Sequence, residues 1–220
     1  MTPRADPSAF IRANTRVHPV PHTPEIRLHL ADEAMDLWQK TEAELEKMNL
    51  PPPFWAFAWA GGQALARYVL DNPQIFAGRA VLDFATGSGL VAIAAARAGA
   101  ASVTACDIDP FANAATALNA ALNGVSLAIL ADDLLDAPPP AVDVLLSGDV
   151  FYEKPMAERV LPWLDAARKA GTTVLVGDPG RSYLPMDRLE RLATYDIEVN
   201  RSLEDFSVKR TSVFQLRAEA

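Results

Sequence analysis

The strongest indication of the fold comes from residues 80–90, which read AVLDFATGSGL. They begin with the apolar run of a buried strand, and a glycine-rich turn follows at once. Gly87 and Gly89 allow the backbone to turn tightly and to approach a ligand with no Cβ atom in the way. A helix that begins at this turn points its unpaired N–H groups at that ligand. The stretch therefore predicts a nucleotide-binding turn.

Strands and helices alternate after this unit. Further strands are predicted at 102–107, 126–131, 142–148 and 172–177, with helices at 90–100, 110–122 and about 154–170. Two last strands, 195–200 and 211–216, follow without a helix between them. This order predicts an α/β, Rossmann-like sheet of seven strands, mostly parallel, that closes with a hairpin and an antiparallel last strand. Ligands of such sheets bind at the carboxyl ends of the strands.

The first 50 residues form an N-terminal extension to a domain that spans residues 51–220. A short strand is predicted at 25–31, and an amphipathic helix follows with Asp32 as its N-cap. The triple proline at 51–53 marks the boundary. We expect this helical and strand extension to act as a lid or as a substrate-docking segment.

All three histidines, His18, His22 and His29, lie in that extension. The main body therefore lacks the base that Ser-His-Asp and Cys-His mechanisms require. Prolines separate the three histidines, so we expect them on an extended arm and expect no metal site.

Composition narrows the range of partners. With 20 Lys and Arg against 28 Asp and Glu, the formal net charge is −8, which disfavours nucleic acid and favours a basic protein segment. The single cysteine, Cys106, fits a reducing compartment, and we expect the cytoplasm. The start of the chain lacks a signal-peptide pattern, and the uncharged stretch 110–131 is interrupted by Asn and Gly, so we expect no membrane association. The oligomeric state stays open.

The glycine-rich turn could bind more than one cofactor that contains adenosine, and acidic side chains at the strand ends indicate which one. Residues 87–92 also match the loose dinucleotide pattern G-x-G-x-x-A, so an NAD-dependent oxidoreductase is one alternative. Asp107 ends the second strand, where a carboxylate can bind ribose hydroxyls. Asp83 would repel a pyrophosphate but could hold the amino group of a methionine moiety. Asp132 and Asp133 end the third strand and can accept a hydrogen bond from adenine. These carboxylates favour S-adenosylmethionine.

The motifs VLDFATGSG, VTACDIDPFA and LADDLLD, in this order, resemble those of the seven-stranded S-adenosylmethionine-dependent methyltransferases. The upstream stretch PPPFWAFAWAGGQALARYVLDNP and the downstream stretch GDVFYE are similar to the protein-lysine methyltransferases with an Asp-x-x-Tyr motif. Across residues 50–217 the chain looks most like the electron-transfer flavoprotein β-subunit lysine methyltransferase group. The resemblance implies methyl transfer from S-adenosylmethionine to lysines of that subunit.

The resemblance also implies a set of residues around the cofactor. They are Trp59, Asp83, Ala85, Gly87, Gly89, Asp107, Ile108, Asp132 and Asp133. In this set Trp59 closes over the cofactor, and either Asp133 or Asp132 meets adenine. Ala85 stands where the broad pattern has glycine, so we expect a backbone conformation there that alanine tolerates.

Asp149 and Tyr152 follow the fourth strand, where the methyl group should emerge. The resemblance implies that Asp149 holds the target amine and that Tyr152, with Phe151 and Trp55, walls its channel. The alternatives are an N-cap role for Asp149 and ordinary packing for the aromatic residues. The turn at 178–181 could line the same mouth.

Other functions stay open beside lysine methylation of this subunit and the NAD-dependent alternative. The acceptor could be a ribosomal protein or a small-molecule amine, and the chain could be a cofactor-binding adaptor without activity.

Overall fold

The computed structural model describes residues 6–31, 52–199 and 208–218. The helix predicted after Asp32 lies outside the described residues. The helices are α1 (Pro7–Asn14), α3 (Ala60–Asp71), α4 (Pro73–Phe76), α5 (Leu90–Arg97), α6 (Pro110–Leu122) and α7 (Lys154–Lys169), with 3-10 turns η1 (Phe54–Ala56), η2 (Leu134–Asp136) and η3 (Met186–Arg188). The strands are β1 (Arg16–Val20), β2 (Thr23–Leu30), β3 (Ala80–Phe84), β4 (Ser102–Cys106), β5 (Ala128–Leu130), β6 (Val144–Gly148), β7 (Thr173–Asp178), β8 (Leu189–Glu198) and β9 (Val208–Leu216).

The main sheet has seven strands in the order β5-β4-β3-β6-β7-β9-β8. Strands β3 to β7 run parallel, whereas β9 is antiparallel to both of its neighbours. The predicted seven-stranded α/β sheet and its closing hairpin are confirmed. The start of β8 was predicted six residues too late, at 195 instead of 189. This strand lies at the sheet edge with mostly exposed side chains, so its first half lacks the hydrophobic alternation that marks a strand.

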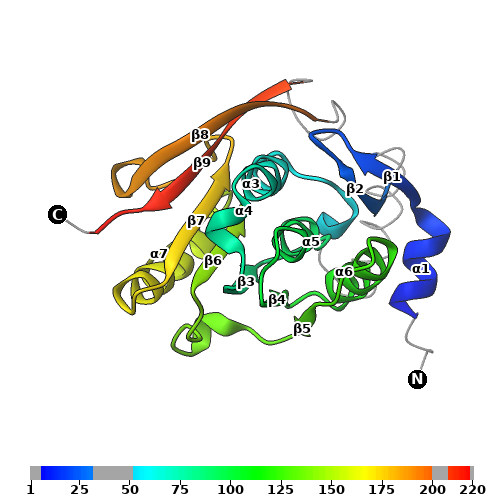
Figure 1. Cartoon of the computed structure of the whole chain (residues 1–220), viewed down its shortest axis with the longest axis horizontal. Coiled ribbons are helices and arrows are strands. Elements are labelled where there is room, and N and C mark those ends of the chain that lie inside the picture. Colours follow the sequence, from blue (N-terminus) through cyan, green and yellow to red (C-terminus); the bar gives the residue numbers. More distant parts are fainter. Residues whose placement is uncertain (1–5, 32–51, 200–207, 219–220) are drawn as a thin grey trace.

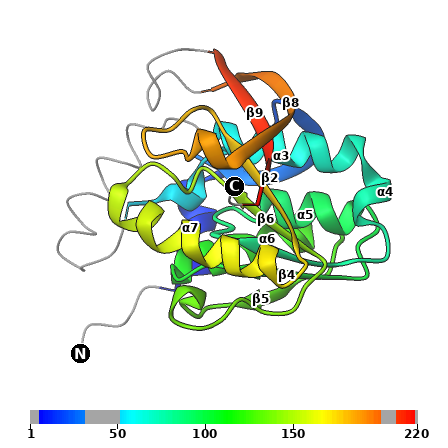
Figure 2. The same cartoon turned by 90° about the vertical axis from the view of Figure 1, so that its left-hand side faces the viewer.

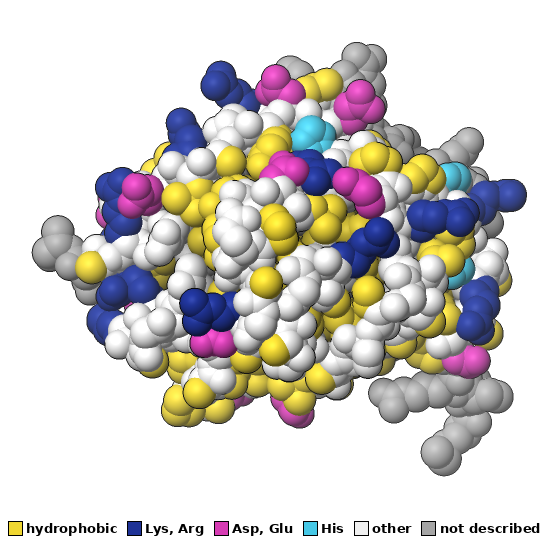
Figure 3. All heavy atoms as spheres, in the orientation of Figure 1, with side chains coloured by type: hydrophobic (Ala, Val, Ile, Leu, Met, Phe, Trp, Pro, Cys, Tyr) yellow, Lys and Arg dark blue, Asp and Glu magenta, His cyan; other side chains and the backbone are white. Residues whose placement is uncertain are grey.

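Helices cover both faces of the sheet. Figure 1 shows α3, α5 and α6 on one face, and Figures 1 and 2 show α7 on the opposite face. On the face drawn in Figure 3, acidic and basic side chains are interspersed among apolar ones, without a field of one sign. The uncharged stretch 110–131 forms α6, a turn and β5, and no helix of the described residues is long and apolar enough to cross a membrane.

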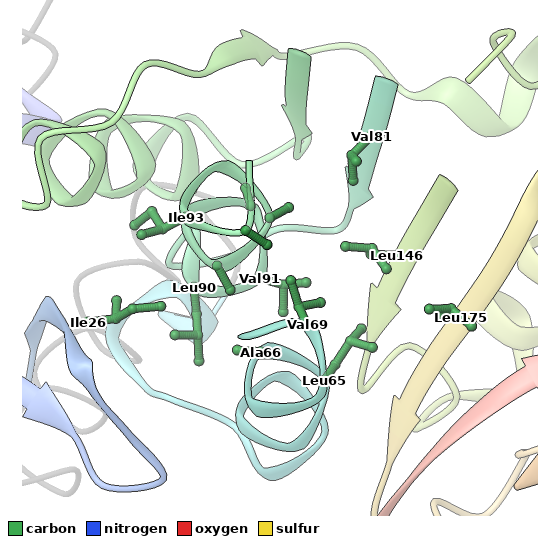
Figure 4. Packing of buried hydrophobic residues seen from close by; sticks show 14 of the residues in the cluster. Ile26, Leu65, Ala66, Val69, Val81, Leu90, Val91, Ile93, Leu146 and Leu175 are labelled. Carbon is green, nitrogen blue, oxygen red and sulfur yellow. The ribbon is translucent and has the colours of Figure 1, made fainter. Parts of the chain in front are cut away.

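The larger core lies between the sheet and the helices α3 and α5. Figure 4 shows Leu65 and Val69 of α3 and Val91 of α5 directed at Leu146 of β6 and Leu175 of β7. These side chains are buried, which removes the apolar face of each helix from water. The packing fixes where both helices begin, at the carboxyl edge of the sheet.

The described part of the extension is folded onto the domain. Strands β1 and β2 form a hairpin in which His18 lies opposite Leu28, so the expectation of an extended arm is wrong for His18. Strand β2 confirms the strand predicted at 25–31, which contains His29. Backbone N–H groups of the hairpin donate to side-chain oxygens of α6 and of its C-cap: His29 N–H to Asn119 Oδ1 at 2.8 Å and Arg27 N–H to Asn123 Oδ1 at 3.0 Å. The role of a lid or docking segment stays a prediction.

Helix α3 begins in direct backbone contact with the end of β7. A Cβ atom on Gly177 would stand 2.2 Å from the carbonyl oxygen of Gly61 and 2.8 Å from Cβ of Leu65. Neither the start of α3 nor the end of β7 can move away from this contact, because Leu65 and the end of β7 are both buried. The position of α3 against β7 therefore requires glycine at position 177.

We expect Gly177→Ala to lower the free energy of unfolding by about 2 kcal/mol or more, because overpacking a filled contact costs about 1–3 kcal/mol. Gly62→Ala is the matched control, since a Cβ there meets nothing within 4 Å. Alanine at this helical position should raise stability by about 0.5–1 kcal/mol. Urea unfolding followed by circular dichroism measures both, and equal effects of the two changes would contradict the contact.

Candidate active site

A cavity of about 440 Å³ opens at the carboxyl edge of the sheet. This volume lies in the range of about 300–1,000 Å³ usual for small-molecule sites. Predicted site residues that line it are Trp55, Trp59, Asp83, Ala85, Gly87, Asp107, Ile108, Asp132, Asp133, Asp149, Tyr152 and Arg181. Gly89 and Phe151 are not among its lining residues. The parallel strands end at one level, which brings together side chains from distant parts of the sequence.

Asp83 holds the glycine-rich turn against the start of α5. Its Oδ2 accepts hydrogen bonds from the Thr86 hydroxyl, at 2.5 Å, and from the Ala92 N–H, at 3.0 Å. The side chain is buried, and this burial raises the pKa of Asp83 to about 7 against the two hydrogen bonds that lower it. Asp83 therefore shapes the turn and also reaches the cavity.

The backbone of the turn takes left-handed conformations. Gly87 has a φ of +54° and Gly89 a φ of +82°. Ala85 has a φ of +57°, so the expectation of a conformation that alanine readily tolerates is wrong. Gly89 is the N-cap of α5, and a Cβ there would lie 3.0 Å from Cγ2 of Thr116. Its glycine is needed for packing between α5 and α6.

Asp107 braces the same turn from β4. Its Oδ2 accepts from the Gly87 N–H at 2.9 Å and its Oδ1 from the Asp109 N–H at 3.0 Å. Burial raises the pKa of Asp107 above its ordinary value. Beside it, Ile108 is 69% exposed and offers an apolar surface to the cavity.

The two neighbouring carboxylates after β5 differ in their partners. Asp133 accepts from the Leu135 N–H at 3.1 Å as the cap of η2, and it pairs with Arg159 at 2.9 Å. The backbone oxygen of Asp132 accepts from the Cys106 thiol. Among the described residues, none forms a hydrogen bond or an ion pair with the Asp132 carboxylate. Asp132 is therefore the better candidate to bind adenine.

Aromatic side chains form the wall opposite the turn. Trp59 lies just before α3 and donates from Nε1 to the Phe54 carbonyl at 2.8 Å. The Tyr152 ring lies 5.6 Å from the Phe54 ring and is 40% exposed. Burial raises the pKa of Tyr152 above its ordinary value.

Of the predictions for Phe151 and Trp55, the one for Phe151 is wrong, whereas Trp55 lines the cavity and also packs in the core. Phe151 is 1% exposed and packs in the core beneath α7, so its predicted place in the channel wall is wrong. Trp55 stacks on Phe111 with ring centroids 6.1 Å apart and is 3% exposed, which makes it mainly a core residue at the cavity floor.

Asp149 follows β6 with a φ of +56° and forms a buried ion pair. Its Oδ1 accepts from Nη2 of Arg181 at 2.8 Å, and its Oδ2 accepts from the Gly62 N–H at 3.1 Å. The N-cap alternative for Asp149 is wrong, because α7 begins at Lys154 with Glu153 at the cap position. The turn at 178–181 was predicted at the mouth, but the pairing of Arg181 with Asp149 was not predicted. Gly61, which leaves room for the Asp149 carboxylate at the start of α3, and the Gly62 N–H that donates to it were not predicted either.

The charges of the cavity match a cationic ligand. Six aspartates line it: Asp83, Asp107, Asp109, Asp132, Asp133 and Asp149. Its two lining arginines are both held by carboxylates, Arg159 by Asp133 and Asp136, and Arg181 by Asp149. Such a set repels a pyrophosphate and attracts a positively charged nucleoside. The described residues contain no group of three or more His, Cys, Asp or Glu arranged to hold a metal ion.

We expect Asp83 to make stability depend on pH. The folded pKa of about 7 stands above the ordinary value of 3.8, so the folded protein keeps a proton that the unfolded chain has released. Stability is therefore full below about pH 4 and falls as pH rises toward 7. Relative to Asp83→Asn, the wild-type free energy of unfolding should drop by on the order of 3 kcal/mol over this range.

Urea unfolding at pH steps from 4 to 7.5 measures this difference. Asp136→Asn applies the same replacement to a side chain that is 80% exposed, and its curve should run parallel to the wild type. A parallel curve for Asp83→Asn as well would contradict the assignment.

Three comparisons with known proteins bear on this site. The family model described as ribosomal protein L11 methyltransferase (PrmA) matches residues 64–148. A ribosomal protein L11 methyltransferase of Bacillus pumilus is 34% identical over 152 residues, which are 66% of this chain and 44% of that protein. Among solved structures, a magnesium protoporphyrin IX methyltransferase from Synechocystis PCC 6803 with bound SAM is 14% identical with a TM-score of 0.53, over 99% of this chain and 100% of that one.

Other relatives are more similar over more of the chain. The electron transfer flavoprotein beta subunit lysine methyltransferase of Homo sapiens is 40% identical over 79% of this chain and 66% of that protein. The protein of the same name from Xenopus laevis is 39% identical over 94% of this chain and 86% of that protein. The similarity to the Xenopus laevis protein therefore extends over most of the length of that protein and of this chain. The chain belongs to the electron transfer flavoprotein beta subunit lysine methyltransferase family.

Proposed function

We propose that this protein is a protein-lysine N-methyltransferase that transfers methyl groups from S-adenosylmethionine to lysines of the electron transfer flavoprotein beta subunit. The observation that carries the proposal is the placement of Asp149 and Tyr152, which follow β6 at the edge of an acidic cavity. The names of the relatives at 38–39% identity support the substrate. The net charge of −8 supports a basic surface on the partner.

The chain's residues fit the cofactor. S-adenosylmethionine supplies a methyl group on a positively charged sulfur, which a neutral amine can displace in line. Asp83 and the turn would hold its methionine end, Asp107 its ribose and Asp132 its adenine. Methyltransferase family membership and the acidic cavity both stand against the NAD-dependent alternative.

The acceptor lysine must lose a proton before transfer. With an ordinary pKa near 10.4, fewer than about one lysine in a thousand is neutral at pH 7. Desolvation against Trp59 and Tyr152 disfavours the ammonium form and lets the proton leave to water. Aromatic faces also accommodate the charged methylated product through cation–π contact.

A ribosomal protein is the second candidate acceptor, because the L11 methyltransferase model matches part of the chain. That match ends at Gly148, one residue before Asp149. It therefore covers the strands and turn on the cofactor side and omits the residues proposed to meet the acceptor. We also propose a cytoplasmic location, which the single, buried Cys106 supports.

Incubation with labelled S-adenosylmethionine and the purified beta subunit tests the substrate. We expect label on lysine side chains of that subunit and none on ribosomal protein L11 or on free lysine. Label on L11 alone, or on a small amine alone, would replace the proposed acceptor. No transfer to any acceptor from a lysate would contradict lysine methylation itself.

We expect Asp149→Asn to slow transfer by about 100-fold or more, a loss typical when a group at the reacting centre is removed. Tyr152→Phe keeps the ring and should lose about tenfold or less. Affinity for S-adenosylhomocysteine should change by less than about threefold in both. Glu153→Gln, the adjacent exposed cap position of α7, is the matched control and should transfer at the wild-type rate. Equal losses of rate and affinity in Asp149→Asn would make Asp149 a cofactor ligand.

The two carboxylates after β5 should differ in their effect on cofactor affinity. Asp132→Ala should weaken S-adenosylhomocysteine binding about tenfold, as expected for the loss of one hydrogen bond. Asp133→Ala should change it by less than about threefold, because the Asp133 oxygens are engaged by Leu135 and Arg159. Calorimetric titration gives both dissociation constants, and the reverse order would assign adenine to Asp133.

A further inference from the structure

The Asp149 carboxylate is held from two sides at the acceptor end of the cavity. The start of α3 donates the Gly62 N–H to Oδ2, and Arg181 donates from Nε, at 3.1 Å, and Nη2, at 2.8 Å, to Oδ1. The Asp149 backbone N–H donates to the Gly177 carbonyl at 2.9 Å. The side chain is 11% exposed, so little water screens its charge.

Arg181 is equally well fixed. Asp178 accepts the backbone N–H groups of Gly180 and Arg181 on its Oδ1, each at 2.7 Å, which sets the turn that carries the guanidinium. The guanidinium carbon lies 5.8 Å from the centre of the Trp59 ring. The Arg181 side chain is 18% exposed and lines the cavity beside Asp149.

This pairing removes a conflict in the proposed chemistry. An unpaired carboxylate beside the acceptor would stabilise its ammonium form and raise its pKa, which keeps the nitrogen unreactive. A carboxylate whose charge is cancelled can still accept a hydrogen bond from the amine, because an oxygen has two lone pairs. The protonation state of the acceptor amine then depends on whether the positive charge of Arg181 cancels the negative charge of Asp149.

We propose, on the basis of the proposed function, that Arg181 is a positioning residue that cancels the charge of Asp149 and so keeps the acceptor amine neutral. The acceptor's N–H bond breaks, its electron pair stays on the nitrogen, and the proton passes to water. Asp149 orients the neutral amine, and Trp59 and Tyr152 keep it from water.

Other titratable groups face this pair from the surrounding elements. Asp178 lies behind it on β7, and its pKa is raised to about 6 by burial and by Asp149. Tyr152 lies between β6 and α7, where burial and the negative charges of Glu153 and Asp107 raise its pKa. None of these supplies a positive charge, so Arg181 is the described cavity residue that balances Asp149.

Binding of two cofactor analogues tests the proposal without any acceptor protein. Sinefungin carries an amine where S-adenosylmethionine carries its S-methyl group, and S-adenosylhomocysteine carries no group there. The ratio of their dissociation constants therefore reports how the site treats an ammonium at the transfer position. We expect Arg181→Gln to favour sinefungin about tenfold, Asp149→Asn to disfavour it about tenfold, and the double change to restore the wild-type ratio within about threefold.

Arg159→Gln is the matched control, because Arg159 lines the same cavity near the adenine end, and its ratio should not change. If Arg181→Gln alone does not fold, the comparison of Asp149→Asn with the double change still measures Arg181. Equal ratios in those two variants, or an unchanged ratio in Arg181→Gln, would overturn the proposal.

Single-turnover transfer at saturating beta subunit gives a second readout. The pH at which the rate reaches half its maximum should rise by about one unit in Arg181→Gln and return to within about half a unit in Arg181→Lys. A rate that falls equally at every pH would assign Arg181 a structural role only. Absence of transfer by the wild type would contradict the proposed function, whereas the analogue ratios would still decide the role of Arg181.

Discussion

A buried carboxylate that must be neutralised organises the proposed acceptor side of the cavity. Asp149 can lie out of water only because the start of α3 and Arg181 both meet it. A buried charge is unfavourable unless it is paired and hydrogen-bonded, so these segments have to be seated together. The contact of Gly61 with Gly177 makes this approach possible, and the aromatic wall at Trp59 follows from where α3 begins.

The proposed cofactor side and the proposed acceptor side of the cavity are built differently. Asp83, the turn and Asp107 lie within 25 residues of one another, and they contact each other through strand ends that are neighbours in the sheet. The acceptor side combines segments near residues 59, 149 and 181. The match to the L11 methyltransferase model covers the first side and ends just before Asp149. The family model therefore covers the segment that carries the turn, Asp83 and Asp107, and it does not extend to Asp149 or Arg181.

Two non-glycine residues in left-handed conformations mark the level at which the cavity begins. Ala85 follows β3 and Asp149 follows β6, two strands that pair in the sheet. Such a conformation costs about 1–2 kcal/mol for an L-residue. It turns the chain sharply at the end of each strand, which directs the backbone of the turn and the Asp149 side chain toward the same space.

Local sequence patterns predicted the elements from β3 to β7, the glycine-rich turn and the strand-end aspartates, because hydrophobic periodicity and turn residues are properties of short segments. The folded structure adds what depends on contacts between distant residues: the insertion of β9 between β7 and β8, the burial of Phe151, and the different partners of Asp132 and Asp133. It also decided the pairing of Asp149 with Arg181, which are 32 positions apart. No local pattern encodes such a pair, because their meeting depends on how β6 and β7 end beside each other.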